Sequence, residues 1–238
     1  GKKVEGLVLD LSTNGGGSLE DAVKIAGLFF KTGNVVKQSA RDDAKEQALF
    51  DKDPSVDWSG PLVVLTSRIS ASASEIVAGT LKYYKRAVIL GNDHTFGKGS
   101  VQSVMPVPSN LGAIKVTVGM FYTAGGNSTQ HRGVDSDIFI PGAYESDEVG
   151  EKTLDYSLPP KTIEGFLSPD AYVKEGSDAW KVVDSGWIKS LAARSKERVA
   201  KNEEFKKIID ESLKAKSKGR LIKLGEIMKD KNFKEKKE

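Results

Sequence analysis

The chain has 238 residues and no cysteine, and its 36 basic side chains nearly balance 33 acidic ones. An apolar fraction of 38%, with 24 glycines, is ordinary for one large globular domain or two small ones. The absence of cysteine excludes a disulfide framework, a thiolate zinc site, an iron–sulfur cluster and a cysteine nucleophile. Two histidines, His94 and His131, are too few for a three-histidine metal site, so we expect any hydrolytic chemistry to use another base.

Charge is distributed unevenly along the chain. Residues 181–238 carry 18 basic and 10 acidic side chains, a net charge of +8, whereas the remainder has a net charge of −5. This pattern is typical of a solvated lysine-rich helical region, or of a basic surface that binds an acidic partner protein. Aromatic residues do not alternate with the basic ones, so we expect no nucleic-acid partner. No apolar run approaches the roughly 18 residues of a transmembrane helix.

The first elements alternate between strand and helix. Apolar residues 7–9 predict a short strand, followed by a loop over residues 12–17 and a helix that ends near Leu28. Residues 40–60 are polar and lack periodicity, which predicts a surface excursion. The start lacks an initiator methionine and runs at once into a buried strand, so we expect a piece of a longer protein.

The next segments predict a parallel unit. Residues 61–65 form a continuous apolar run, typical of a strand buried on both faces. Residues 70–84 predict a helix and residues 87–91 another strand. A strand, helix and strand at this spacing form a βαβ unit, so part of the sheet should be parallel.

Beyond Val101 the pattern favours extended structure and then helices. Residues 114–122 alternate like a strand, and residues 127–130 and 133–140 suggest a further hairpin or paired extended segments. Residues 141–160 resemble a linker. The remaining chain is predicted to be mainly helical, in three segments: residues 187–199, 205–213 and 221–228.

A glycine run could bind an anion. Gly15, Gly16 and Gly17 lie directly after a predicted buried strand and before a helix. Exposed N–H groups at such a place suit a phosphate or a developing oxyanion. The alternative is a tight strand-to-helix turn without chemistry.

A run of small residues, Ser70 to Glu75, opens the second predicted helix. A serine there could be a nucleophile, because the helix dipole stabilises negative charge at its N-terminus. Ser70 and Ser74 could equally be helix caps, a role in which serine is common.

A lysine between two glycines, Lys98, follows the strand at 87–91. The surrounding residues do not form a phosphate-binding loop, which needs four residues between its glycines and a hydroxyl residue after the lysine. A desolvated lysine can lose its proton near neutral pH and act as a base, although most lysines are surface residues. Serine with lysine as base needs no histidine, which suits this chain.

Four segments together resemble the C-terminal processing, or tail-specific, proteases, which are the S41 serine peptidases. They are GLVLDLSTNGGG (6–17), PLVVLTSRISASASEIVA (61–78), RAVILGNDHTFGKGSVQ (86–102) and STQHRGVDSDIFIP (128–141). The resemblance implies an α/β fold with a crotonase-like protease core and a mixed sheet, followed by a mainly helical region. It divides the chain into a protease core (1–142), a linker (143–160) and a helical extension (161–238).

The resemblance also implies roles for single residues. Ser72 corresponds to the family nucleophile, Lys98 to the base, and Gln102 to the glutamine that orients this lysine. The backbone N–H of Ala73 and those of the glycines at 15–17 correspond to the oxyanion hole. An aspartate that some members carry in the helix after the serine falls on Tyr83 here. No metal or other cofactor is implied.

The resemblance implies a polypeptide substrate that is unfolded or marked at its C-terminus, and export to the periplasm. Members also carry a PDZ domain before the protease core, which we expect to be missing from this chain, so the chain by itself could be inactive. The alternative function is that of a non-catalytic module on the same fold, which binds an apolar ligand or a partner protein.

Overall fold

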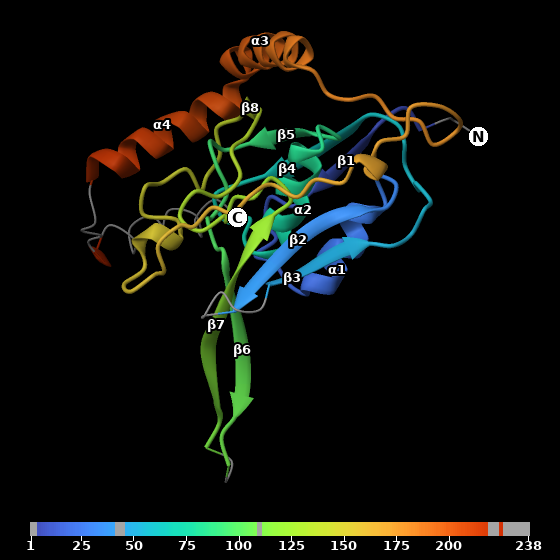
Figure 1. Ribbon diagram of the computed structural model, residues 1–238. Helices are drawn as coiled ribbons and strands as arrows, with labels where there is room; N and C mark the ends of the chain where they lie inside the picture. Colours follow the sequence, from blue (N-terminus) through green and yellow to red (C-terminus); the bar gives the residue numbers. More distant parts are fainter. Residues whose placement is uncertain (1–3, 41–45, 109–110, 219–223, 226–238) are drawn as a thin grey trace.

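Two four-stranded sheets form the centre of the computed structural model, which describes residues 4–40, 46–108, 111–218 and 224–225 (Figure 1). The first sheet is parallel, in the order β1 (Leu7–Asp10), β4 (Leu62–Thr66), β5 (Val88–Gly91) and β8 (Ile138–Phe139). The second is antiparallel, in the order β3 (Glu46–Asp51), β2 (Gly33–Ala40), β7 (Ala113–Thr123) and β6 (Ser100–Pro106). The predicted mixed α/β architecture is therefore confirmed.

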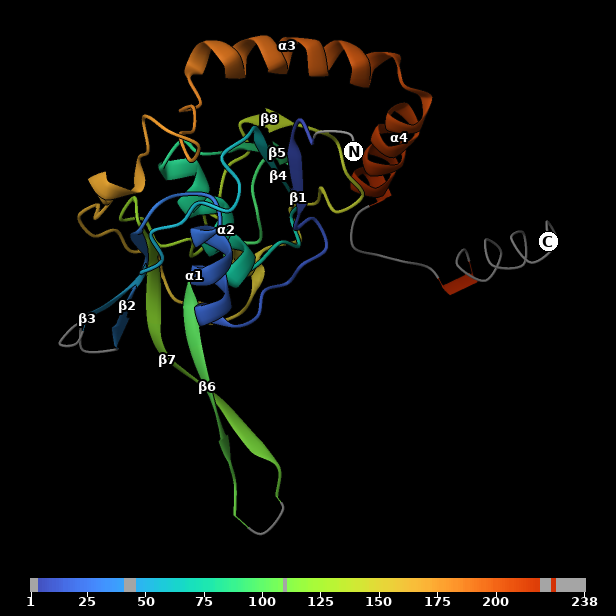
Figure 2. The same cartoon turned by 90° about the vertical axis from the view of Figure 1, so that its right-hand side faces the viewer.

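Helices cover both faces of the parallel sheet. The helices are α1 (Leu19–Gly27), α2 (Ala73–Tyr83), α3 (Ser185–Lys201) and α4 (Glu203–Lys218), with short 3₁₀ turns at Glu151–Thr153 and Pro169–Ala171. Val64 and Ile89 are fully buried in the core that also holds the apolar side of α2. Alternate residues such as Val63 and Leu90 point the other way and face α3, which crosses above this sheet (Figure 2). This alternation explains the continuous apolar run predicted to be buried on both faces.

The polar region at 40–60 was predicted as a surface excursion, and this prediction is wrong in part. Residues 46–51 form strand β3, which pairs with β2 at the edge of the antiparallel sheet. Strand β2 itself was not predicted. Most side chains of β3 are exposed and only Asp51 is buried, so no alternating apolar pattern marks this strand.

Of the two alternatives predicted for residues 127–140, the hairpin is wrong, and paired extended structure is confirmed only in part. Only Ile138 and Phe139 form a strand there, and they pair in parallel with β5. Asp137 makes this pairing possible, because its carboxylate accepts hydrogen bonds from the Ile89 N–H at 2.8 Å and from Lys82 Nζ at 2.6 Å. Hydrogen bonds between residues so far apart in the chain produce no local periodic pattern in the sequence.

Strands β6 and β7 form a long hairpin that projects from the body (Figures 1 and 2). Its base lies in the antiparallel sheet, and the pairing shifts between Val101 and Gln102. Several of its apolar side chains are exposed, including Val104, Met105, Leu111 and Ile114. The hairpin thus starts directly after Lys98 and leads away from it.

The segment that precedes the C-terminal helices packs against the body. Ala171 and Trp180 are buried members of the same core as α2 and β4. The division at 142 and 160 remains a prediction. The helices predicted at 187–199 and 205–213 correspond to α3 and α4, whereas the one predicted at 221–228 lies largely outside the described residues. No helix among the described residues is long and apolar enough to cross a membrane.

Candidate active site

Ser72 lies on a sharp turn between strand β4 and helix α2. It is the N-cap residue of α2, and its φ of 57° and ψ of −114° are rarely adopted by residues other than glycine. Backbone strain of this kind concentrates at functional sites, where a strand-to-helix turn can present a nucleophile. The side chain is half-buried. The local geometry therefore singles out Ser72 among the serines of residues 70–74.

The other two serines of that run have structural roles. Ser70 Oγ donates to the carbonyl of Leu11 at 2.7 Å, and Ser74 Oγ donates to the Asn14 carbonyl at 2.9 Å. The Ala71 N–H also donates to the Asn14 carbonyl, at 3.2 Å. These bonds attach the glycine loop to the turn that carries Ser72.

The glycine at position 16 is required by close packing. A Cβ atom on Gly16 would lie 2.8 Å from the Ser72 Cβ and 2.8 Å from the Ala71 carbonyl oxygen, and the φ of Gly16 is +108°. By contrast, a Cβ on Gly15 or Gly17 would meet nothing within 4 Å. The loop thus touches the nucleophile turn at one glycine and leaves space around the other two.

One of the predicted oxyanion donors already has a hydrogen-bond acceptor. The Gly16 N–H donates to Asn14 Oδ1 at 2.8 Å within its own loop. Ala73 is half-buried and directly follows Ser72 in the first turn of α2. An oxyanion would therefore have to compete with Asn14 Oδ1 for the Gly16 N–H, and the oxyanion role of Ala73 and the glycines at 15–17 stays a prediction.

Lys98 projects from a loop that packs tightly on residues 128–131. A Cβ on Gly97 would approach the backbone of His131 to 3.0 Å, and one on Gly99 would approach Ser128 Oγ to 2.5 Å. The two glycines beside Lys98 are thus a packing requirement. Lys98 Nζ donates to Ser100 Oγ at 2.9 Å and to Gln102 Oε1 at 3.2 Å.

The charge state of Lys98 is shifted toward neutral. Burial lowers the pKa of Lys98 below its usual value of 10.5, although nearby Glu151 and Glu75 oppose the shift. A lysine whose pKa is lowered can accept a proton at a pH where an exposed lysine cannot. The hydrogen bonds at Nζ also include Gln102, as predicted, but do not include Ser72 Oγ.

A residue that the sequence analysis missed, Glu75, connects the two loops. Its side chain is fully buried. Oxygen Oε2 accepts from the Ser72 N–H at 2.8 Å and from the Lys98 N–H at 2.9 Å, and Oε1 accepts from the Gly97 N–H at 2.7 Å and from Thr95 Oγ1 at 2.5 Å. Burial raises the pKa of Glu75 to about 7 against the effect of these bonds. The spacing Ser72-x-x-Glu75, typical of a capping box, was the available signal.

The remaining residues discussed at the sequence level make structural contacts. The Tyr83 hydroxyl accepts from Asn127 Nδ2 at 2.7 Å, and its ring fills the space beside Gly125. His94 Nδ1 lies 2.6 Å from the Thr95 carbonyl, and His131 Nε2 lies 2.8 Å from Ser157 Oγ. Among the described residues, no cluster of three or more acidic or histidine side chains could hold a metal ion.

Comparison with known proteins identifies the family of this chain. The family model described as Peptidase family S41 matches residues 1–140. The chain belongs to peptidase family S41. Ser72, Lys98 and Gln102 all lie within the part that matches the S41 family.

Two curated relatives and one solved structure define the similarity further. The tail-specific protease of Haemophilus influenzae is 36% identical over 92% of this chain and 31% of its own length. The carboxy-terminal-processing protease of Bartonella bacilliformis is 39% identical over 64% of this chain and 36% of its own length. The photosystem II D1 C-terminal processing protease has 38% identity and a TM-score of 0.51, over 58% of this chain and 35% of that chain. The S41 chain described here thus spans about a third of the curated relatives' length.

Proposed function

We propose that this chain carries the catalytic centre of a serine endopeptidase of the tail-specific type. The observation that carries the proposal is the joint anchoring of a strained serine and a half-buried lysine by one buried carboxylate. The Ser72 turn and the Lys98 loop both donate backbone N–H groups to Glu75 Oε2. In this proposal Ser72 is the nucleophile and Lys98 is the base.

Acylation follows from these roles. Ser72 Oγ attacks the carbonyl carbon of the scissile peptide and gives its proton to neutral Lys98 Nζ. The carbonyl oxygen becomes an oxyanion, which the N–H of Ala73 and the glycine loop at 15–17 stabilise. Lys98 then gives the proton to the leaving nitrogen as the C–N bond breaks.

Deacylation uses the same base. A water molecule loses its proton to Lys98 and attacks the acyl carbon, and the proton then returns to Ser72 Oγ. Gln102 accepts from Lys98 Nζ at 3.2 Å and so directs the amine in both steps. The Lys98 side chain must turn from Ser100 toward Ser72 for the first step, and active-site hydrogen bonds commonly tighten only when substrate is bound.

The proposal extends to the substrate and the location. We propose that the substrates are unfolded or C-terminally marked proteins and that the protein acts in the periplasm. The names of the relatives, tail-specific and carboxy-terminal-processing protease, support a substrate selected by its C-terminus. The basic surface of α3 and α4 is proposed as a docking surface for an acidic partner protein.

Replacement of the two central residues tests the proposal. Ser72→Ala and Lys98→Ala should each abolish peptide cleavage by the protein, and Ser72→Ala should also abolish covalent labelling by a fluorophosphonate. Ser55→Ala is the matched control, because Ser55 is exposed and its Oγ donates to Asp53 Oδ1 at 2.7 Å within its own loop. Normal labelling of Ser72→Ala would exclude Ser72 as the nucleophile. A folded chain that never reacts with the probe would favour a non-catalytic binding module.

A further inference from the structure

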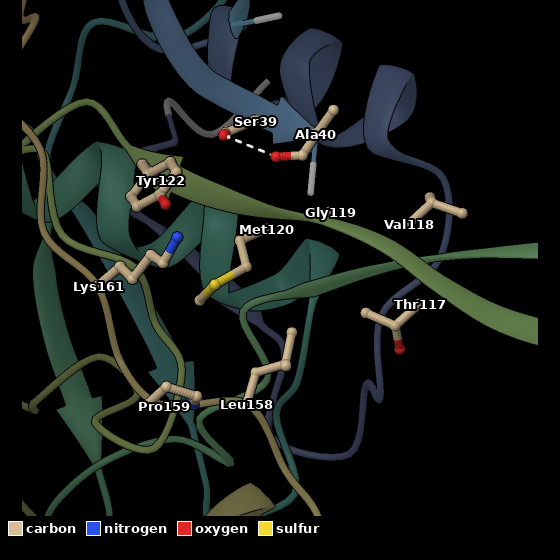
Figure 3. A pocket seen from close by; sticks show the side chains of 10 residues that line it. All are labelled: Ser39, Ala40, Thr117, Val118, Gly119, Met120, Tyr122, Leu158, Pro159 and Lys161. Atoms are coloured by element: carbon tan, nitrogen blue, oxygen red, sulfur yellow. Dashed lines mark hydrogen bonds between the residues drawn. The ribbon is translucent and has the colours of Figure 1, made fainter. Parts of the chain in front are cut away.

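A pocket of about 270 Å³ lies beside the antiparallel sheet (Figure 3). Strand β7 forms its floor, the end of β2 closes one side, and residues 158–161 form the opposite wall. Figure 3 shows the side chains of Met120, Leu158 and Pro159 directed toward this space, with Tyr122 and Lys161 at one end. A cavity of about 150 Å³ already admits a benzene ring, so this pocket has room for a large side chain.

The floor of the pocket is connected to the candidate base through strand pairing. Met120 pairs with Ser100, whose hydroxyl accepts from Lys98 Nζ at 2.9 Å. Thr117 pairs with Gln102, which also accepts from Lys98 Nζ. Met120 and Thr117 on the pocket floor are thus the strand partners of Ser100 and Gln102. These two residues accept the hydrogen bonds from Lys98 Nζ.

The wall of the pocket is connected to the same loop. Gln130 is fully buried and bridges the two segments. Its Nε2 donates to the Leu158 carbonyl at 2.9 Å, while its Oε1 accepts from the N–H of Gly99 at 2.8 Å. The pocket and the Lys98 loop are therefore parts of one rigid hydrogen-bonded unit.

The lining decides which side chain fits. Most of the groups that meet the space are aliphatic, from Val118, Met120, Leu158 and Pro159. A cationic side chain would lose its hydration among these aliphatic groups, which is unfavourable. An aliphatic side chain would lose its contact with water here without leaving a polar group unsatisfied.

We propose that this pocket receives an aliphatic side chain, of about the size of leucine, from the peptide that lies across Ser72 and Lys98. The inference rests on the proposed function, since the peptide is the substrate of that site. It adds a substrate preference beside the scissile bond. Peptides with lysine or arginine at this position should bind poorly.

Methionine methyl resonances offer a direct test that needs no catalysis. The chain contains three methionines, Met105, Met120 and Met228. Met120 lines the pocket, whereas Met105 lies farther out on the hairpin, opposite Ile114. We would label the methionine methyls of the Ser72→Ala chain with ¹³C and titrate it with pentapeptides that carry leucine, alanine, aspartate or lysine at the centre.

The leucine peptide should shift the Met120 methyl resonance in a saturable manner and leave that of Met105 unchanged. The alanine peptide should bind at least about tenfold more weakly, because each lost methylene forfeits apolar contact. Leu158→Trp should fill the pocket and abolish the shift. Leu154→Trp is the matched control, because Leu154 is exposed and lies outside the lining, and it should leave the shift intact.

Three results would overturn the inference: no Met120 shift with any peptide, equal affinities for all four, or a shift that survives Leu158→Trp. None of them would bear on the nucleophile, since Ser72 reactivity is measured separately with the fluorophosphonate. Conversely, an unreactive wild-type serine together with leucine-selective binding would refute the proposed peptidase and leave a peptide-binding pocket.

Discussion

The backbone N–H groups of Ser72 and Lys98 donate to one and the same carboxylate oxygen, Glu75 Oε2, at 2.8 Å and 2.9 Å. The two residues are 26 positions apart in the chain, on different loops. Because a shared acceptor fixes both donors, Glu75 helps to set the separation of these two backbone segments, together with the Phe96 N–H, which donates to the Ser70 carbonyl at 2.9 Å. Glu75 therefore acts as a positioning residue for the proposed serine–lysine pair.

Replacing Glu75 should uncouple the two loops. In Glu75→Gln, the side-chain NH₂ group faces N–H donors, and at least one backbone donor loses its partner. Each unsatisfied buried donor costs about 1–3 kcal/mol, so we expect a lower melting temperature. We also expect slower fluorophosphonate labelling of Ser72. Glu20→Gln, on the exposed side of α1, is the control and should change neither quantity.

The same substitution should alter how stability depends on pH. The pKa of Glu75 is about 7 in the folded chain, against 4.5 for a free side chain. The folded state therefore binds a proton more tightly than the unfolded state does. The stabilisation from that proton is complete below pH 4.5 and is lost as the pH rises through 7. Melting temperatures measured from pH 4.5 to 7.5 should fall less steeply in Glu75→Gln, and an unchanged slope would contradict the assignment.

Reactivity of Ser72 should increase with pH. The base is competent only when Lys98 is neutral, and burial lowers the pKa of Lys98 below 10.5. The labelling rate should rise as the pH approaches that lowered pKa and level off above it. Lys98→Arg should remain unreactive throughout, because a guanidinium keeps its proton. A rate for wild-type that does not vary with pH would argue against lysine as the base.

Gly16 should tolerate no larger residue. An alanine Cβ would lie 2.8 Å from Ser72 Cβ, and the φ of +108° is strained for any residue with a side chain. Such strain alone costs about 1–3 kcal/mol. Gly16→Ala should thus lower the melting temperature, whereas Gly17→Ala, which meets no atom within 4 Å, should change it little. Equal melting temperatures for the two variants would mean that the loop moves freely away from the serine.

Truncation should distinguish the segment before α3 from the helices themselves. Trp180 stacks on Tyr172, which in turn meets Tyr84 edge-on, so this segment completes an aromatic core. The buried Arg86 guanidinium also lies 5.5 Å from the Trp180 ring. A chain that ends at residue 184 should fold with reduced stability, and one that ends at residue 160 should fail to fold. Circular dichroism and thermal melts would compare the two, and equal stability would place a domain boundary near 160.

Local sequence pattern was sufficient for the elements that carry the proposed chemistry. Strand β4 and helix α2 follow from an apolar run and a helical apolar spacing, and both begin close to the predicted residues. The predicted extended segment at 133–140 did not locate strand β8 or its parallel pairing, because two residues have no periodicity and the bond from the Ile89 N–H to the Asp137 carboxylate joins residues far apart in the chain. The role of Glu75 was missed for a similar reason. Its position in the sequence indicates a helix cap, but its complete burial depends on the Lys98 loop that packs against it.

The positive φ of Ser72 bears on which hydroxyl amino acid can occupy this position. Threonine has a comparable hydroxyl, but its branched Cβ disfavours a left-handed backbone. The Ser72 Cβ also lies 2.8 Å from the place where Gly16 would carry its own Cβ. Steric fit, rather than intrinsic nucleophilicity, thus reserves the position for serine.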